Sequence, residues 1–155
     1  LMAMVRVQRY ARRSLSPTTL HGPLSRIGQK YPGISGNCAV FAQKLRKALG
    51  PEAGYIVISG GDYEYADHVA VWYKGHVLDS DGVSTLKQFK DKWGQPDLNR
   101  NDEWYIPEFE FWENVTDEED ELVLKLADEG GLFCIPIDHN ELERELRAKI
   151  AAVVR

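Results

Sequence analysis

A chain of 155 residues is long enough to bury the core of one globular domain, and its net charge of −5 gives no reason to expect nucleic acid as a partner. Hydrophobic residues make up 43% of the sequence and charged residues 28%, as in an ordinary globular protein. No apolar run approaches the ~18 residues that span a bilayer, and the first residues do not resemble a secretory signal. We therefore expect a single cytoplasmic domain over residues 1–155, with no membrane partner.

The chain begins with a basic segment and a loop. Residues 1–16 are predicted to form a basic N-terminal arm, because they hold four arginines and no acid. We interpret the arm as a solvated segment, and the alternative is a docking element for a partner or an acidic surface. Residues 16–36 hold several glycines and prolines, so we expect mostly loop there.

The clearest early element is a helix over residues 38–49, with Cys38 at its start. Apolar residues recur at helical spacing along this segment, and Gly50-Pro51 ends it. The start of a helix gathers unpaired N–H groups and the positive end of the helix dipole. That environment lowers the pKa of a thiol, so Cys38 is a candidate nucleophile.

Strands are predicted next, over residues 55–59, 68–73 and 76–80. The last two form a hairpin whose loop is Lys74-Gly75, a two-residue loop of the kind that joins paired strands.

The register of this hairpin brings a histidine and two acids together. A two-residue loop makes Tyr73 face His76, and facing residues project to the same side of a sheet. His68 then shares a face with both candidate acids, with Asp81 opposite and Asp79 on the diagonal.

The rest of the chain is predicted to alternate between helices and strands. In chain order these are a short helix over 86–92 anchored by Trp93, an aromatic strand over 103–112 broken at Pro107, a helix opened by the capping box Thr116–Glu119, a strand over 132–137, and a C-terminal helix over 138–155 capped by Asn140. The overall prediction is an α+β domain, with a helix packed on an antiparallel sheet and additional C-terminal helices.

Several side chains outside the candidate site are expected to be structural. The second cysteine, Cys134, lies in an apolar run that is typical of a buried free thiol, and two cysteines do not indicate a disulfide framework. The helix after Thr116 should bury Leu122 and Val123. The aromatic cluster of residues 104–112 is expected to be core or a partner surface rather than a substrate cleft.

A thiol, an imidazole and a carboxylate together form a known catalytic unit. The imidazole takes the thiol proton and later protonates the leaving amine, and the carboxylate orients the imidazole. The backbone N–H of Cys38 would help to bind the oxyanion, and Asn37 and Gln29 are the candidates for a second donor.

The stretches Gly36-Asn37-Cys38-Ala39 and His68-Val69-Ala70-Val71 through Asp79-Ser80-Asp81 resemble the papain-like superfamily in its compact bacterial and phage forms. These forms include NlpC-type peptidases, transglutaminase-like proteins and papain-fold effector deamidases. The resemblance covers residues 33–82. It implies a papain-like core with Cys38 as nucleophile, His68 as base and Asp79 as orienting acid, with Asp81 as the alternative acid, and it implies no cofactor. The Cys-Gly-x-Cys-Trp signature of papain itself is missing, which counts against proteolysis as the specific activity.

Three hypotheses follow for the function. The first is a thiol hydrolase or deamidase that acts on an amide bond or glutamine side chain of a peptide or protein. The second is a non-catalytic papain-like binding protein that works through its surface and terminal helices. The third is a metal site built from Cys38, His68 and an aspartate, which ranks last because the sequence lacks paired-ligand spacing.

Overall fold

The computed structural model describes residues 15–31, 37–61, 65–99, 101–126 and 136–154. The basic arm, apart from its last two residues, lies outside the described residues, and so does Cys134. Residues 136 and 137, at the end of the predicted strand over 132–137, are not in a strand.

Within the described residues, an antiparallel five-stranded sheet has the order β4-β3-β2-β1-β7. Its strands are β1 (Gly54–Ser59), β2 (His68–Tyr73), β3 (His76–Asp79), β4 (Gly82–Thr85) and β7 (Glu108–Trp112). A separate two-stranded ribbon pairs β5 (Asp97–Leu98) with β6 (Trp104–Tyr105). The aromatic strand predicted over 103–112 is therefore divided at Pro107, as expected, but its two halves belong to different sheets.

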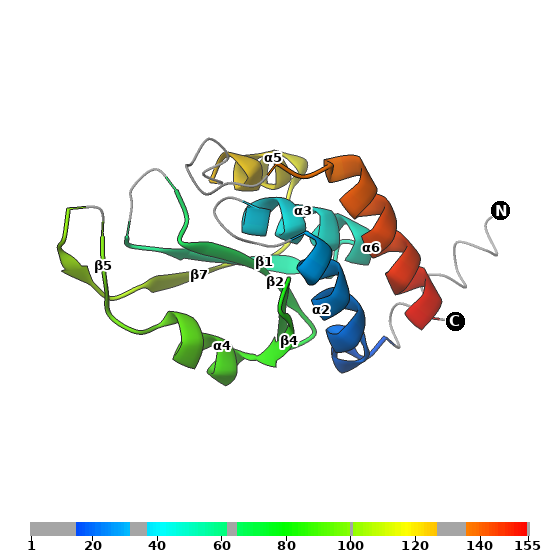
Figure 1. The fold of residues 1–155 in the computed structure, drawn as a ribbon, viewed down its shortest axis with the longest axis horizontal. Coiled ribbons are helices and arrows are strands. Elements are labelled where there is room, and N and C mark those ends of the chain that lie inside the picture. The colour runs from blue at the N-terminus through cyan, green and yellow to red at the C-terminus, as the bar shows by residue number, and fades with distance from the viewer. Residues whose placement is uncertain (1–14, 32–36, 62–64, 100, 127–135, 155) are drawn as a thin grey trace.

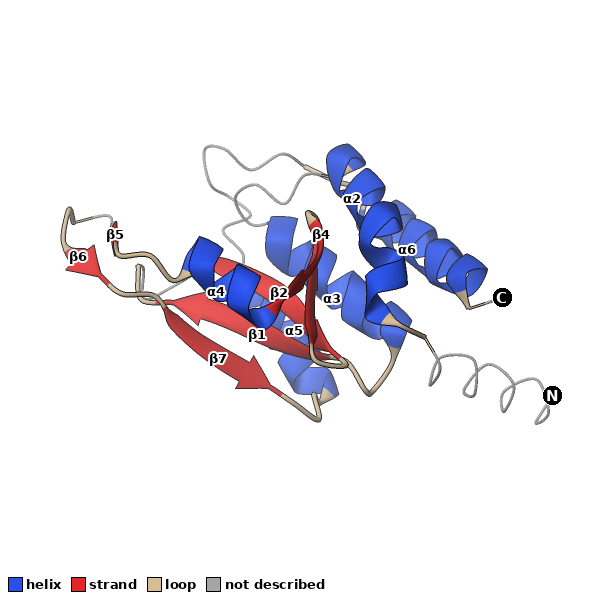
Figure 2. Cartoon of the chain, turned by 90° about the horizontal axis from the view of Figure 1, so that it is seen from below, coloured by secondary structure: helices blue, strands red, loops and turns tan. Residues whose placement is uncertain are grey.

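Helices cover both faces of the sheet (Figure 1). The described helices are the 3₁₀ turn η1 (Pro17–Leu20) and the α-helices α2 (His21–Lys30), α3 (Asn37–Leu49), α4 (Leu86–Trp93), α5 (Asp117–Lys125) and α6 (His139–Val153). One face carries α2, α3, α5 and α6, and α4 lies on the other, nearest the viewer in Figure 2. The α+β prediction, with a helix packed on an antiparallel sheet, is confirmed. None of these helices combines the length and apolar character that a membrane crossing requires.

Two apolar clusters correspond to these two faces. The larger one joins the apolar face of α3, including Val40, Phe41 and Leu45, to the sheet and to α2 and α6. The smaller one packs Phe89 of α4 against Ala70 and neighbouring residues of the opposite sheet face. Because successive strand residues point to opposite faces, β2 contributes to both clusters.

The predicted hairpin is present in its predicted register. Tyr73 pairs with His76, and the loop residues Lys74 and Gly75 have φ angles of 47° and 76°. Positive φ at both loop positions is the mark of a type I′ turn, whose twist matches that of the strands.

The loop predicted over residues 16–36 is wrong for residues 17–30, which are helical. Pro17 and Pro23 stand in the first turns of η1 and α2, where a missing N–H costs nothing. Gly28 allows the backbone of α2 to lie close to that of Ser80, since a Cβ at this position would be 1.8 Å from the Ser80 carbonyl oxygen. These residues therefore fit a helix that crosses the turn after β3.

Two details of the C-terminal helices also differ from the expectation. The N-cap of α6 is Asp138 rather than Asn140, and its carboxylate accepts the N–H groups of Asn140 and Glu141 at 3.0 Å each. In α5 Val123 is buried as predicted, but Leu122 is 45% exposed because α5 packs through one narrow face, mainly against α3.

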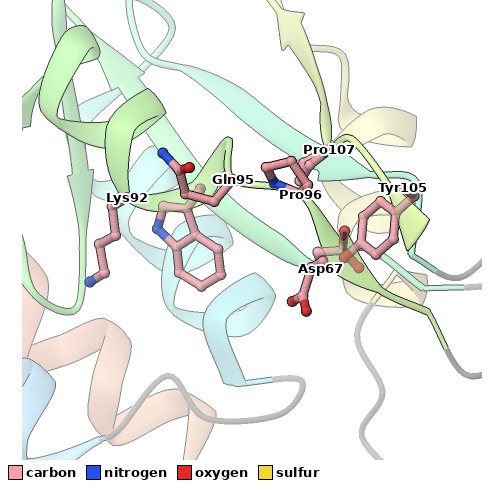
Figure 3. Close-up of a pocket in the computed structure, with 8 residues that line it drawn as sticks. Asp67, Lys92, Gln95, Pro96, Tyr105 and Pro107 are labelled. Atoms are coloured by element: carbon pink, nitrogen blue, oxygen red, sulfur yellow. Dashed lines mark hydrogen bonds between the residues drawn. The ribbon is translucent and has the colours of Figure 1, made fainter. Parts of the chain in front are cut away.

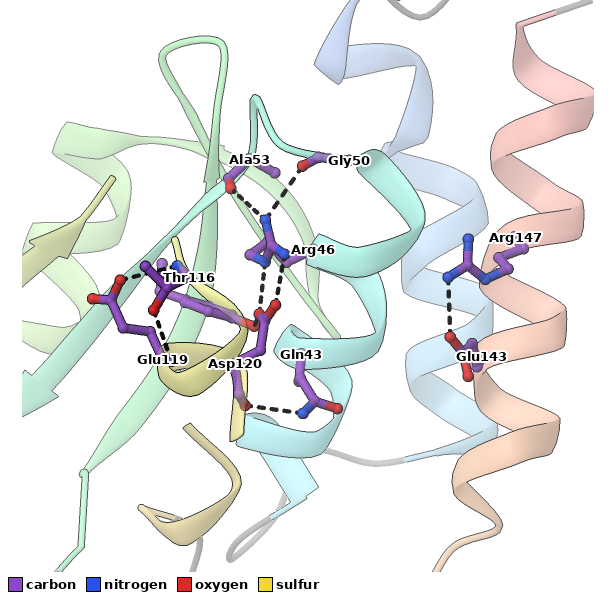
Figure 4. Close-up of polar contacts among 10 residues, drawn as sticks. Gln43, Arg46, Gly50, Ala53, Thr116, Glu119, Asp120, Glu143 and Arg147 are labelled. Carbon is purple, nitrogen blue, oxygen red and sulfur yellow. Dashed lines mark hydrogen bonds and ion pairs between the residues drawn. The ribbon is translucent and has the colours of Figure 1, made fainter. Parts of the chain in front are cut away.

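A buried ion pair joins α3 to α5 (Figure 4). The guanidinium of Arg46 donates to both carboxylate oxygens of Asp120 at 2.7 Å, and the Tyr55 hydroxyl donates to the same carboxylate at 2.6 Å. Gln43 donates to the Asp120 carbonyl at 2.9 Å. Asp120 belongs to an acidic run that resembles a solvated helix start, but it is only 2% exposed. The network holds the helix that carries Cys38 against the sheet and α5.

Candidate active site

Cys38 is the second residue of α3, a partly exposed free thiol. Burial raises the pKa of this thiol, but its hydrogen bond with His68 and the charge of that imidazole act in the opposite direction. Hydrogen bonds from the backbone at Val69 and Ala39 assist. The net effect lowers the pKa of Cys38, which favours the thiolate.

His68 is the first residue of β2 and is 5% exposed. Its Nε2 lies 3.0 Å from Oδ2 of Asp79, so Nδ1 is the nitrogen left for the thiol. Burial lowers the pKa of His68, but the hydrogen bonds with Asp79 and Cys38 and the charges of both groups raise it to about 9. The lowered pKa of the thiol and the raised pKa of the imidazole together favour a thiolate–imidazolium pair.

The acid that contacts His68 is Asp79, the last residue of β3. Its second carboxylate oxygen accepts the backbone N–H of Asp81 at 2.9 Å, which holds the side chain in place. Asp79 pairs with Gly82 across a tight turn, so Asp81 lies at the tip of that turn. The Asp81 side chain is 68% exposed and forms an ion pair with Lys92 at 2.6 Å. Asp81 is therefore not the acid that orients the imidazole in this structure.

A tryptophan covers the imidazole. The indole of Trp93, at the end of α4, stacks on the His68 ring with 4.1 Å between centroids and 6° between planes. Phe89, one turn earlier, lies 5.9 Å from the same ring. Sequence reasoning treated Trp93 only as an anchor of its helix. The sequence does carry a sign of this contact in the capping box of Thr85 and Gln88, which sets where α4 begins. Phe89 and Trp93 are four residues apart and so lie on one face of that helix.

The two candidates for the second oxyanion donor lie in different surroundings. Asn37 is the first residue of α3, adjacent to Cys38, and is 3% exposed. Gln29 lies near the end of α2 with its side chain exposed to solvent. Asn37 is thus the candidate that the helix start holds beside the thiol.

A cavity of about 510 Å³ opens beside the imidazole, between the end of α4 and the β5–β6 ribbon (Figure 3). Asp67 and Trp93, which line it, flank His68: one precedes it in the chain and the other stacks on its ring. Tyr105 also lines this cavity, so one member of the aromatic cluster lies in a cleft rather than in the core.

The imidazole of His68 hydrogen-bonds both the Asp79 carboxylate and the Cys38 thiol, and so it links the other two side chains. Among the described residues, no group of three or more His, Cys, Asp or Glu side chains is placed to hold a metal ion.

Comparisons with models of protein families, with curated proteins and with solved structures find no match to this chain.

Proposed function

We propose that this protein is a papain-like thiol enzyme that acts on amides, either as a hydrolase of an amide bond or as a deamidase of glutamine side chains. The observation that supports this most strongly is the position of His68, which binds Asp79 through one nitrogen and Cys38 through the other. A nucleophile, a base within its reach and an acid that orients the base are the three parts that acyl transfer needs.

The first half of the proposed reaction forms an acyl-enzyme. The Cys38 thiolate attacks the amide carbon, and the carbonyl electrons move to the oxygen to give a tetrahedral oxyanion beside the start of α3. The imidazolium of His68 then gives its proton to the amide nitrogen. The carbon–nitrogen bond breaks, the amine or ammonia leaves, and a thioester to Cys38 remains.

The second half returns the enzyme to its starting state. Neutral His68 accepts a proton from a water molecule, and the hydroxide attacks the thioester carbon. The carbon–sulfur bond breaks, the acid leaves, and the thiolate and imidazolium are restored. Asp79 keeps Nε2 protonated and stabilises the charged ring in both halves.

Packing around the ring supports this proposal. His68 and Asp79 are both buried, and Trp93 and Phe89 cover the imidazole. Exclusion of water strengthens the hydrogen bond between the carboxylate and the imidazole.

The proposal is tested by the rate at which iodoacetamide alkylates each cysteine, measured by mass spectrometry of the two cysteine-containing peptides between pH 5 and 9. Cys38 should react at least ~10-fold faster than Cys134 at pH 6.5, where an ordinary thiol with a pKa of ~8.5 is almost fully protonated. Cys134 serves as the internal control. Slow and equal alkylation of both cysteines would overturn the proposal.

A further inference from the structure

The cavity beside His68 has a fixed acidic side chain at its inner end. The backbone N–H of Asp67 donates to the carbonyl of Ile58 at 2.7 Å, and the Tyr105 hydroxyl donates to its carboxylate at 3.1 Å. Gly61 permits this packing, since a Cβ there would lie 2.6 Å from Oδ1 of Asp67. The Asp67 carboxylate is thus held at one place in the cavity wall (Figure 3).

The charge of the cavity is negative on balance. Asp97 adds a second carboxylate to the lining. Lys92 also lines the cavity, but its ammonium group forms an ion pair with Asp81 outside it. A ligand in the cavity therefore meets the two carboxylates of Asp67 and Asp97, whereas the charge of Lys92 is already balanced by Asp81.

The other walls suit a long aliphatic side chain. Trp93, Tyr105, Pro96 and Pro107 give the cavity aromatic and proline surfaces. Lysine and arginine bury their carbon chains along such surfaces and place the charged end against carboxylates or aromatic faces.

The ribbon on the rim of the cavity exposes large apolar side chains. Trp104 is 73% exposed, Ile106 is 72% exposed and Leu98, which pairs with Trp104, is 44% exposed. We call these three residues the apolar rim. In the ribbon Asp97 pairs with Tyr105 and Leu98 with Trp104, so the apolar rim lies on the face of the ribbon opposite the cavity.

We propose that the cavity binds a lysine or arginine side chain of the substrate protein. The basic side chain enters the cavity between Asp67 and Asp97. This inference rests on the proposed function, because it names the class of substrate presented to Cys38.

The charge of the cavity is tested with three methanethiosulfonates: the cationic trimethylammonioethyl and the anionic sulfonatoethyl reagents, which are of similar size, and the small neutral methyl reagent. In each, the Cys38 thiolate displaces methanesulfinate and forms a mixed disulfide. Rates at Cys38, read by peptide mass spectrometry, are divided by the rates of the same reagents with free cysteine. The normalised ratio of cationic to anionic rates should be ~10, and Asp97→Asn should lower it ~3-fold. Glu121→Gln, the same charge change on α5, should leave it unchanged.

Recognition of a substrate segment is tested with two acetylated hexapeptides that differ only by lysine or glutamate beside a leucine. The lysine peptide should slow the reaction of Cys38 with the neutral reagent, and the glutamate peptide should not. Asp97→Asn should weaken the protection by the lysine peptide at least ~3-fold, whereas Trp104→Ala, on the opposite face of the ribbon, should leave that protection unchanged.

The outcomes separate the two proposals. If Cys38 reacts with the neutral reagent no faster than Cys134, the proposed function fails. If Cys38 reacts rapidly but without charge preference, or if both peptides protect equally, only the inference about the substrate fails.

Discussion

At Cys38, burial and the neighbouring imidazole act on the thiol in opposite directions. Burial favours the neutral thiol, and His68 favours the thiolate by hydrogen bonding and by its charge. The imidazole prevails because Asp79 in turn stabilises its protonated form. The reactivity of one side chain is thus decided by two others that lie far from it in the chain.

The first prediction concerns His68. His68→Gln should return the pKa of Cys38 to its ordinary range or above, because only the backbone hydrogen bonds at Val69 and Ala39 then oppose the effect of burial. The alkylation rate at pH 6.5 should fall at least ~10-fold. The matched control is His76→Gln, near the hairpin loop, which should leave the rate unchanged. An equally reactive thiol in His68→Gln, with a normal circular dichroism spectrum, would remove His68 from the mechanism.

The second prediction concerns the choice between the two acids. A carboxylate stabilises the imidazolium, so Asp79→Asn should lower the pKa of His68 from about 9 towards ~6.5, the value of an unperturbed histidine. The imidazolium would then be lost at a lower pH than in the wild type. NMR titration of the His68 ring measures this shift. Asp81→Asn is the control two residues away, and a similar shift in that variant would contradict our assignment of the acid.

At the scale of elements, α4 connects the small apolar cluster to the candidate site. Phe89 packs in the cluster, and Trp93 on the same helix face stacks on His68. The capping box at Thr85 aligns the start of the helix with the end of β4. A helix of eight residues is too short to be stable alone, so α4 depends on its cap and on its packing against the sheet.

The third prediction follows from this position. Trp93→Ala should lower the free energy of unfolding by ~3 kcal/mol, because it removes a large packed side chain, and should slow the alkylation of Cys38 at pH 6.5 several-fold, because water gains access to the imidazole. Urea denaturation and alkylation rates measure the two effects. Trp112→Ala removes a tryptophan that packs on Tyr55 instead. It should destabilise the protein without slowing alkylation, and equal slowing in both variants would show that the effect is only one of stability.

For the whole molecule, the buried contact of Arg46 with Asp120 joins two helices and the sheet. It links α3 and α5, and the Tyr55 hydroxyl adds the sheet. Both side chains of the ion pair are buried, so loss of either one would leave the other as an unpaired buried charge.

The fourth prediction concerns this ion pair. Asp120→Ala should lower the free energy of unfolding by ~4 kcal/mol, since it leaves the Arg46 charge buried and removes the acceptor of Tyr55. The surface pair Glu143–Arg147 on α6 is the control, and Glu143→Ala should cost less than ~1 kcal/mol (Figure 4). Urea denaturation compares the two. A similar small loss in both variants would contradict the structural role of the buried pair.

Most of the local structure could be predicted from the sequence. The helix that begins beside Cys38, the register set by Lys74-Gly75 and the capping box at Thr116 all depend on neighbours within a few residues. Helix periodicity, turn geometry and capping act over such short spans. The hairpin register is why His68 and Asp79 could be placed on one face before any contact was known.

The contacts between distant segments were decided only by the tertiary structure. The sequence left Asp79 and Asp81 as alternatives, and the tight turn into β4 separated them by placing Asp81 at its tip. The stacking of Trp93 on His68 depends on how α4 crosses the sheet. The sequence by itself determined α3, the β2–β3 hairpin and the start of α5, and it singled out Cys38 and His68, because these follow from local periodicity, capping and turn chemistry. The tertiary structure decided which acid contacts the imidazole, what covers the imidazole and where the acidic cavity lies, because burial and side-chain contact depend on the path of the whole chain.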